Sequence, residues 1–320
     1  MTVHLAVLPP DPEEPRLEIN LAAPDLGSWR AGNTGIEGVW QFDSPAPGPH
    51  LVVTALVHGN EIAGAALLVR WLEQGLRPMV GRLTLVFANL AAFDRFDAGD
   101  PTASRFVDED MNRIWASDLL AGGRRSVELD RARTLVPVVD RADVLLDLHS
   151  MLWPSDPLFI AGPGEGARML GAMLGTPGLV VSDDGHAGGL RMIDHTRFLG
   201  GPRALLLEAG PHWQPETLAQ MEHTATWLLR HLGMAPSVPG NSPPPGRLAR
   251  VTRTVTAQTA GFAFLRPCRG GEVVARRNTL IALDGEVELR TPHDDCLLVM
   301  PSPRTMRGHT AVRFAAFDPP

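Results

Sequence analysis

The chain of 320 residues contains no tyrosine and only two cysteines, Cys268 and Cys296. Without tyrosine, no phenol side chain can take part in any site of the protein. Two cysteines are too few for a disulfide framework, and they lack the paired spacing of a cysteine zinc site. We expect both to be buried as small hydrophobic residues.

Long apolar runs and a basic excess are also missing. No apolar run approaches the roughly 18 residues that a membrane-spanning helix needs, and residues 1–18 lack the basic head and apolar core of a leader peptide. These absences predict a cytoplasmic protein with no membrane partner. The net charge of -7 and the pI near 5.9 disfavour nucleic acid, which requires a basic face. The oligomeric state stays open, and a homo-oligomer is compatible with the sequence.

Beyond residue 50, apolar strand-like runs alternate with helical patterns. The runs lie at 51–57, 82–89, 143–150, 178–184 and 204–210, and the helical patterns at about 61–75, 126–141, 164–175 and 215–232. Near-continuous apolar strands that alternate with helices are covered on both faces. The sequence therefore predicts an α/β fold, with a mostly parallel or mixed sheet flanked by helices.

The stretch 233–246 is rich in Pro, Gly and Ser and has the composition of a linker. After it, short β-like segments separated by glycine turns replace the earlier alternation. We therefore expect an α/β domain over residues 1–235, which begins with a β segment in residues 1–50. A small all-β C-terminal domain should follow over residues 247–320.

The stretch "LVVTALVHGNEIAGAALL" passes from a strand pattern to a helical one, and His58 and Glu61 stand at this junction. Open α/β sheets bind ligands at the carboxyl ends of their strands. Two histidines and a glutamate are a recurrent ligand set of catalytic zinc, which keeps a fourth position for water. Gly59 and Asn60 would let the backbone turn so that both side chains converge on one ion. A short HxxE pattern also arises by chance, and a histidine at a strand end is commonly a hydrogen-bonded surface residue.

Two further strand ends carry polar residues. "DLHS" places His149, the candidate third ligand, at the end of an apolar run, and Asp147 shares its face of the strand and could orient a ligand. "ALLLEAG" places Glu208 after four apolar residues. Beside a metal, such a carboxylate is the expected general base. The alternative is that Glu208 caps the helix that follows it.

The segment "RFVDEDMNRIW", residues 105–115, contains Arg105, Asn112 and Arg113 in an acid-rich context. Guanidinium groups bind carboxylates bidentately and can stabilise a developing oxyanion near a metal. The segment is therefore a candidate substrate-binding loop. The alternative is a solvated loop in which the arginines pair with its acidic residues, Asp108, Glu109 and Asp110.

The four motifs "HGNE", "RFVDEDMNR", "DLHS" and "LLLEAGPH", in this order, resemble the succinylglutamate desuccinylase/aspartoacylase family. This family is zinc-dependent and related to carboxypeptidases of the A type. The resemblance covers about residues 50–215, and a β-rich C-terminal region also suits the family. It implies that His58, Glu61 and His149 hold one zinc ion per chain and that Glu208 is the general base.

The resemblance also implies roles around these ligands. Arg105 matches the arginine that polarises the scissile carbonyl, and Asn112 and Arg113 match the pair that holds a substrate carboxylate. Asn89 resembles the asparagine of a short family turn. Between Asn89 and Arg105 the chain is several residues longer than the common pattern, and Met111 replaces the usual leucine.

Two substrate-binding positions depart further from the family pattern. Where a further substrate arginine is expected, the chain has Phe198, so Arg197 or Arg191 is the candidate replacement. The tyrosine that some members contribute from the C-terminal domain cannot be present. His309 falls near its place only in a loose alignment. The resemblance therefore implies less about the substrate than about the metal.

These features predict zinc-dependent hydrolysis of the amide bond of a small N-acyl amino acid, or of a related N-acylated amine that bears a carboxylate. Glu208 would take the proton from a zinc-activated water that attacks the carbonyl beside Arg105. An anionic substrate is expected because two or three arginines would line the pocket of an acidic protein. The alternatives are a carboxypeptidase-like or other amide hydrolase on the same scaffold, a non-enzymatic binding protein, and a structural α/β protein. The acyl group, the amine and the pathway stay open.

Overall fold

The computed structural model describes residues 17–162, 164–238 and 242–319, so predictions for residues 1–16 and 239–241 lie outside the described residues. The strands up to residue 211 are β1 (Val39–Asp43), β2 (His50–Ala55), β3 (Arg82–Phe87), β4 (Val144–Met151), β5 (Leu158–Ala161), β6 (Leu179–Ser182) and β7 (Arg203–Pro211). The C-terminal strands are β8 (Arg247–Thr256), β9 (Phe262–Phe264), β10 (Val273–Val274), β11 (Leu280–Asp284), β12 (Val287–Arg290), β13 (Cys296–Val299) and β14 (Thr310–Phe317). The α-helices are α1 (Ile62–Glu73), α2 (Leu90–Phe93), α3 (Ser117–Ala121), α4 (Val127–Val139), α5 (Glu165–Leu174) and α6 (Pro215–His231).

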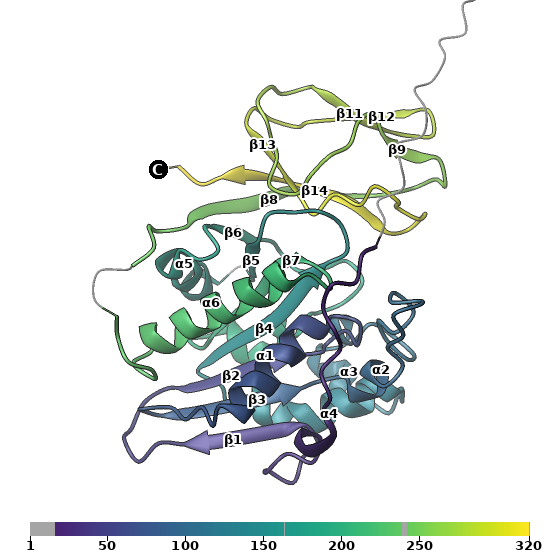
Figure 1. The fold of residues 1–320 in the computed structure, drawn as a ribbon. Helices are drawn as coiled ribbons and strands as arrows, with labels where there is room; N and C mark the ends of the chain where they lie inside the picture. Colours follow the sequence, from purple (N-terminus) through teal and green to yellow (C-terminus); the bar gives the residue numbers. More distant parts are fainter. Residues whose placement is uncertain (1–16, 163, 239–241, 320) are drawn as a thin grey trace, which may run out of the picture.

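One mixed sheet runs through the molecule, in the strand order β1-β3-β2-β4-β7-β5-β6-β8-β14-β13-β10 (Figure 1). Its centre is parallel, since β2 pairs in parallel with both β3 and β4, and β4 with β7. A second sheet has the order β12-β11-β9. The prediction of an α/β fold with a mixed sheet and a smaller β region at the C-terminus is confirmed.

Helices cover both faces of the central strands, which explains their continuous apolar sequences. Along β2, Leu51 and Val53 belong to the core beneath α1, α5 and α6, whereas Val52 belongs to the core beneath α4. Successive strand residues point to opposite faces, so a strand covered on both sides must be apolar at almost every position. All residues of β4 are buried.

Most elements lie where the sequence predicted them, and β5 is the main exception. The five strand-like runs became β2, β3, β4, β6 and β7, and the four helical patterns became α1, α4, α5 and α6. β5 was not predicted, because a strand of four residues, "LFIA", is too short to show a periodicity. It runs antiparallel to β7 and parallel to β6, and it contributes to the mixed character of the sheet together with other antiparallel pairs such as β1 with β3.

The C-terminal region is all β, as predicted, but its strands extend the main sheet. β8 pairs in parallel with β6, from Leu179 opposite Arg247 to Ser182 opposite Arg250. β8 then pairs with β14, and β14 with β13. These strands also share a separate apolar cluster with the second sheet. A domain division between residues 235 and 247 stays a prediction, since the sheet is continuous across it.

The two cysteines are free thiols. Cys296 is buried in the C-terminal apolar cluster, as predicted, and Cys268 is only half-buried at its margin. Among the described residues, no helix has the length and apolar character needed to cross a bilayer.

Candidate active site

His58 and Glu61 are brought together by the turn between β2 and α1. Gly59 in this turn is required by close packing. A Cβ atom there would lie 2.3 Å from the backbone carbonyl carbon of Ala92 and 2.6 Å from the carbonyl oxygen of Ser104. The φ angle of Gly59 is not positive. The glycine of "HGNE" therefore admits neighbouring backbone against the turn and does not provide an unusual backbone conformation.

The three predicted metal ligands converge. Nδ1 of His58 lies 2.6 Å from Oε1 of Glu61, and Nδ1 of His149 lies 3.1 Å from Oε2 of the same carboxylate. One ligand atom from each residue lies within 4.8 Å of the others. The exposed fractions of His58, Glu61 and His149 are 4%, 2% and 2%, so these are not hydrogen-bonded surface residues.

A carboxylate binds the outer nitrogen of each histidine. Nε2 of His149 lies 2.8 Å from Asp147, which also accepts a hydrogen bond of 2.5 Å from the Thr54 hydroxyl. Nε2 of His58 lies 2.9 Å from Oδ1 of Asp110. A metal-binding imidazole is neutral and presents the lone pair of Nδ1 when its hydrogen is on Nε2, so the carboxylate beside each Nε2 would favour this tautomer in a metal-bound site. Asp147 was predicted for this role, whereas Asp110 was expected only as a partner of arginines.

The electrostatics of the group favour charged carboxylates. Burial would raise the pKa of Glu61, but His58 and His149 hold that pKa well below its usual range. Burial would lower the pKa of His149, but Asp147 and Glu61 raise it well above its usual range. Burial likewise opposes ionisation of Asp110, yet His58 and neighbouring arginines keep its pKa well below the ordinary value.

The donor set fits a zinc ion. Two imidazole nitrogens and one carboxylate oxygen, each ring oriented by a second carboxylate, are the ligands and supporting contacts expected of a catalytic zinc site. The same atoms contact one another directly in this structure, with both inner nitrogens directed at Glu61. His58, Glu61 and His149 are therefore the residues that could hold a metal.

Glu208 lies next to this group on β7, where it is the register partner of His149. Its Oε2 atom is buried and has no hydrogen-bond partner among the described residues. Burial raises the pKa of Glu208 to about 8, against the opposing effect of His149. The helix-cap alternative is wrong, because α6 begins at Pro215 and its N-cap is Gln214. A buried carboxylate without a partner, beside a possible metal, suits a proton acceptor.

The loop before Asp110 is held by Glu128, a residue that the sequence analysis missed. The fully buried Glu128 carboxylate accepts hydrogen bonds from the backbone amides of three consecutive residues, Val107, Asp108 and Glu109. Asn89 also donates to it and accepts the amide of Ala92 at the start of α2. Its position in the first turn of a predicted helix was visible in the sequence, but only the fold brings its carboxylate next to the loop before Asp110.

Arg105 and Arg113 both approach Asp110, as the solvated-loop alternative expected, but this carboxylate belongs to the site. Nη2 of Arg105 lies 3.2 Å from Oδ2 of Asp110 and 2.9 Å from Nε2 of His58. Nη2 of Arg113 lies 3.7 Å from the same Asp110 oxygen. The Asp110 side chain is only 18% exposed. Asp108 and Glu109 instead contact the start of α4 and the segment before it.

The structure separates the two candidate replacements for the expected arginine at position 198. Arg197 donates to the carbonyl of Ala142, just before β4 begins, and is not brought to the metal ligands. Arg191 lies in the segment next to Asn112, whose side-chain oxygen accepts the backbone amide of Met192. His309 is exposed, and no contact within the described ranges joins it to the site.

A second hydrogen-bonded pair supports Glu61. The amide of Ser150 donates to Oε2 of Glu61 at 2.9 Å, and the Ser150 hydroxyl lies 2.7 Å from Nδ1 of the buried His212. Burial lowers the pKa of His212 to about 4, so the ring is neutral near pH 7. His212 belongs to the quoted "EAGPH" motif but had no predicted role. It helps to fix the backbone that holds Glu61.

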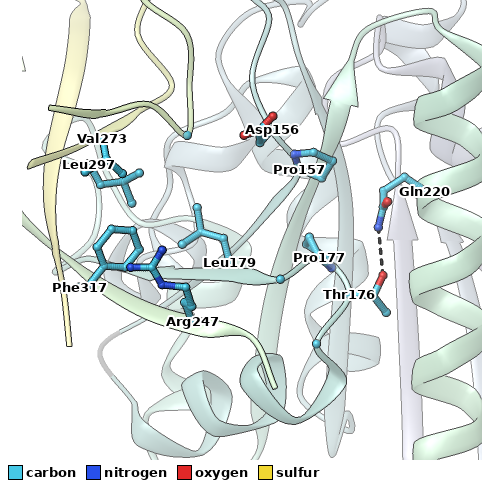
Figure 2. Close-up of a pocket in the computed structure, with 13 residues that line it drawn as sticks. Asp156, Pro157, Thr176, Pro177, Leu179, Gln220, Arg247, Val273, Leu297 and Phe317 are labelled. Atoms are coloured by element: carbon cyan, nitrogen blue, oxygen red, sulfur yellow. Dashed lines mark hydrogen bonds between the residues drawn. The ribbon is translucent and has the colours of Figure 1, made fainter. Parts of the chain in front are cut away.

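A cavity of about 440 Å³ lies elsewhere, between the start of β6 and the C-terminal strands (Figure 2). It is lined by Arg247, whose guanidinium carbon lies 3.6 Å from the centre of the Phe317 ring, and by Gln220, which donates to Thr176. None of the predicted site residues lines it. It is therefore distinct from the candidate metal centre.

Residues 47–232 match the family model of the succinylglutamate desuccinylase/aspartoacylase catalytic domain. A probable aspartoacylase of Parasynechococcus marenigrum (strain WH8102) is 35% identical over 109 residues, which are 31% of this chain and 33% of that protein. An N-acyl-aromatic-L-amino acid amidohydrolase (carboxylate-forming) of Xenopus laevis is 29% identical over 113 residues, 32% of this chain and 35% of that protein. The chain thus matches about a third of the length of these two relatives.

The fold resembles solved structures over almost its whole length. Succinylglutamate desuccinylase of Vibrio cholerae superposes with a TM-score of 0.69 at 17% sequence identity, over 88% of this chain and 86% of that one. At this identity the likeness concerns the fold alone.

Proposed function

Because the chain belongs to the succinylglutamate desuccinylase/aspartoacylase family, we propose that it is a zinc-dependent deacylase. Its substrate would be a small N-acyl amino acid, or a related N-acylated amine, that keeps a free carboxylate. One observation carries the proposal. The buried inner nitrogens of His58 and His149 meet the Glu61 carboxylate beside Glu208, whose Oε2 lacks a partner among the described residues.

His58, Glu61 and His149 would hold the metal. When bound, zinc supplies Lewis acidity, which makes a water molecule more acidic and polarises a substrate carbonyl. Asp110 and Asp147 fix the two imidazole rings so that both Nδ1 atoms point inward. Because such outer carboxylates orient metal ligands, both aspartates should contribute to metal affinity.

Glu208 would move the proton. Its Oε2 atom accepts the proton of the attacking water and then donates it to the nitrogen of the leaving amine. This step requires the ionised form of Glu208, which burial disfavours in the metal-free site. A cation bound by His58, Glu61 and His149 would favour that ionised form, because a nearby positive charge lowers the pKa of a carboxyl group.

Arg105, Asn112 and Arg113 would position the substrate. Arg105 lies beside His58 with 37% of its side chain exposed, so it can reach a carbonyl oxygen at the edge of the site. Arg113 is less exposed, at 24%, and its nearest carboxylate oxygen is the one that Arg105 also contacts. We assign Arg105 to the developing oxyanion and Arg113 with Asn112 to the free carboxylate.

Metal analysis and a substrate panel test the proposal together. Purified protein should contain one zinc ion per chain, and acetyl, succinyl and formyl amino acids should be hydrolysed in preference to short peptides. Glu208→Gln should keep the zinc and lose turnover, whereas His149→Ala should lose both. Cleavage of peptide C-termini instead would favour the carboxypeptidase-like alternative. Protein that neither binds zinc nor hydrolyses any member of the panel would refute the assignment.

The remaining partner assignments are proposals as well. A small anionic substrate suits the arginines of the site, and nucleic acid is not expected for a chain of net charge -7. A cytoplasmic location and a homo-oligomer stay predictions from the sequence.

A further inference from the structure

β14 directs an arginine toward the active-site layer. Val312 and Phe314 of this strand belong to the apolar cluster of the C-terminal region, whereas Ala315 belongs to the core beneath α4. Residues of a strand alternate between faces, so Arg313 points to the same side as Ala315. A charged side chain on a face that is otherwise apolar requires a polar partner or ligand.

The surroundings of Arg313 belong to the active site. Arg313 lies within electrostatic range of Asp183, Arg191 and Glu208. Arg113 and His186 in turn lie within range of Arg313. Strand β14 thus brings a cation of the C-terminal region within electrostatic range of Arg113, the proposed carboxylate-binding arginine of the α/β layer.

Two nearby carboxylates, Asp183 and Asp194, already have a partner in Arg191. Arg191 makes two hydrogen bonds to Asp183, of 2.5 and 3.0 Å, and further ones to Asp194. For Arg313, no ion pair or side-chain hydrogen bond is found in residues 17–162, 164–238 and 242–319. Arg113 comes no closer than 3.7 Å to a carboxylate oxygen. Arg313 therefore lacks a counter-ion of its own among these residues, and Arg113 shares Asp110 with Arg105.

His186 adds a third hydrogen-bond donor. Its Nδ1 atom accepts the backbone amide of Gly188 at 2.9 Å, so in the neutral ring the hydrogen sits on Nε2. Burial and the neighbouring arginines lower the pKa of His186 to about 4, which keeps the ring neutral near pH 7. Arg113, His186 and Arg313 thus offer hydrogen-bond donors from three segments of the chain, which is the chemistry that binds an anion.

We propose that Arg113, His186 and Arg313 form a composite carboxylate pocket that takes the free carboxylate of the N-acyl amino acid. Arg313 is then a specificity-determining residue, and the C-terminal strands take a direct part in substrate recognition. An arginine of β14, rather than His309, would occupy the substrate-binding role for which the chain has no tyrosine. This inference rests on the proposed function for the identity of the ligand, but its charge requirement can be tested without turnover.

The test uses two variants of the full chain. Arg313→Met keeps the apolar part of the side chain and removes the charge, whereas Arg313→Lys keeps the charge and removes the planar guanidinium group. KM and kcat are measured for N-acetyl amino acids and for their carboxamides. We expect Arg313→Met to raise KM for the carboxylates by about 10- to 100-fold, the range of one charge-assisted hydrogen bond. KM for the carboxamides and kcat should change little, and Arg313→Lys should restore part of the discrimination.

Arg250→Met is the matched control, since Arg250 is exposed on the adjacent strand β8. It should leave both KM values unchanged. Calorimetric binding of the same ligand pairs to metal-free protein gives a second readout that does not depend on catalysis. Preference of the wild type for carboxylates, lost in Arg313→Met, supports the pocket even if no hydrolysis is found.

Two results would overturn the inference. One is an active enzyme in which folded Arg313→Met and Arg313→Lys both discriminate carboxylates from carboxamides as the wild type does. The other is metal-free wild-type protein that binds both ligand forms equally. Failure of the proposed function differs from both, because it would appear as absent turnover on every N-acyl amino acid in the wild type.

Discussion

Replacing the proposed general base should make the metal-free protein more stable at alkaline pH. Glu208 is buried, its Oε2 has no partner within the described residues, and burial raises its pKa to about 8. An ionised carboxylate in this position is costly, whereas the amide of Glu208→Gln has nearly the same shape and stays neutral. The substitution should therefore remove the free-energy cost of ionising a buried carboxyl group, together with the proposed catalytic group.

The sign and size follow from the difference between the folded and unfolded chain. Between the ordinary value of 4.5 and about 8, Glu208 holds a proton in the folded state that it has lost in the unfolded state. The free energy of unfolding therefore falls as the pH rises through this window and levels off above it. At about 1.4 kcal/mol per pH unit, the loss is on the order of 4 to 5 kcal/mol.

Urea unfolding in the presence of a chelator measures this effect. At about pH 5, the difference in the free energy of unfolding between Glu208→Gln and wild type gives the pH-independent cost of the buried amide. The change in this difference between about pH 5 and about pH 8.5 isolates the titration of Glu208. We expect the variant to gain several kcal/mol relative to wild type over this range, and added zinc to reduce the gain. The same difference at both pH values would refute the assignment of Glu208 as a protonated buried carboxyl.

Three further predictions concern the surroundings of the metal ligands. Asp110→Asn should weaken zinc binding by about 10- to 100-fold, because it alters the partner that orients His58, and competition with a chelator measures the change. Arg105→Ala should chiefly lower kcat, whereas Arg113→Ala should chiefly reduce the preference for a carboxylate over its amide, each by about 2 to 4 kcal/mol; unchanged kinetics in both would favour a structural role. Gly59→Ala should destabilise the fold by more than about 2 kcal/mol, since its Cβ would overlap backbone atoms, and thermal unfolding at wild-type stability would contradict the packing argument.

Local sequence patterns determined the central architecture and the principal site residues. The strands β2, β4 and β7 are largely apolar because helices cover both of their faces. This pattern can be recognised in the sequence alone. His58 follows β2 in the turn before α1, and His149 and Glu208 lie in the C-terminal halves of β4 and β7. Parallel pairing alone was therefore enough to expect these side chains at one edge of the sheet. The order of the four motifs along the chain then indicated the succinylglutamate desuccinylase/aspartoacylase family.

Residues that act through long-range contacts could not be assigned in this way. Asp110 looked like one acid of a charged loop, and only the approach of that loop to β2 places its carboxylate 2.9 Å from Nε2 of His58. Glu128 is 21 residues from Val107, yet its carboxylate holds the amide of Val107. Arg197, next to position 198, and Arg191 were both candidates for the expected arginine, and which of them approaches Asn112 depends on how the chain turns between β6 and β7.

The sequence by itself determined the α/β core and was enough to predict the metal-binding pattern and the proton acceptor, because each prediction depends on residue types at fixed short spacing along buried strands. Tertiary structure alone decided which charges surround that pattern. β8 continues the sheet after β6, and β14 then places Arg313 within electrostatic range of Glu208, which is more than 100 residues away in the sequence. Charge interactions depend on distance in space and on burial, and neither quantity is encoded in the local order of residues.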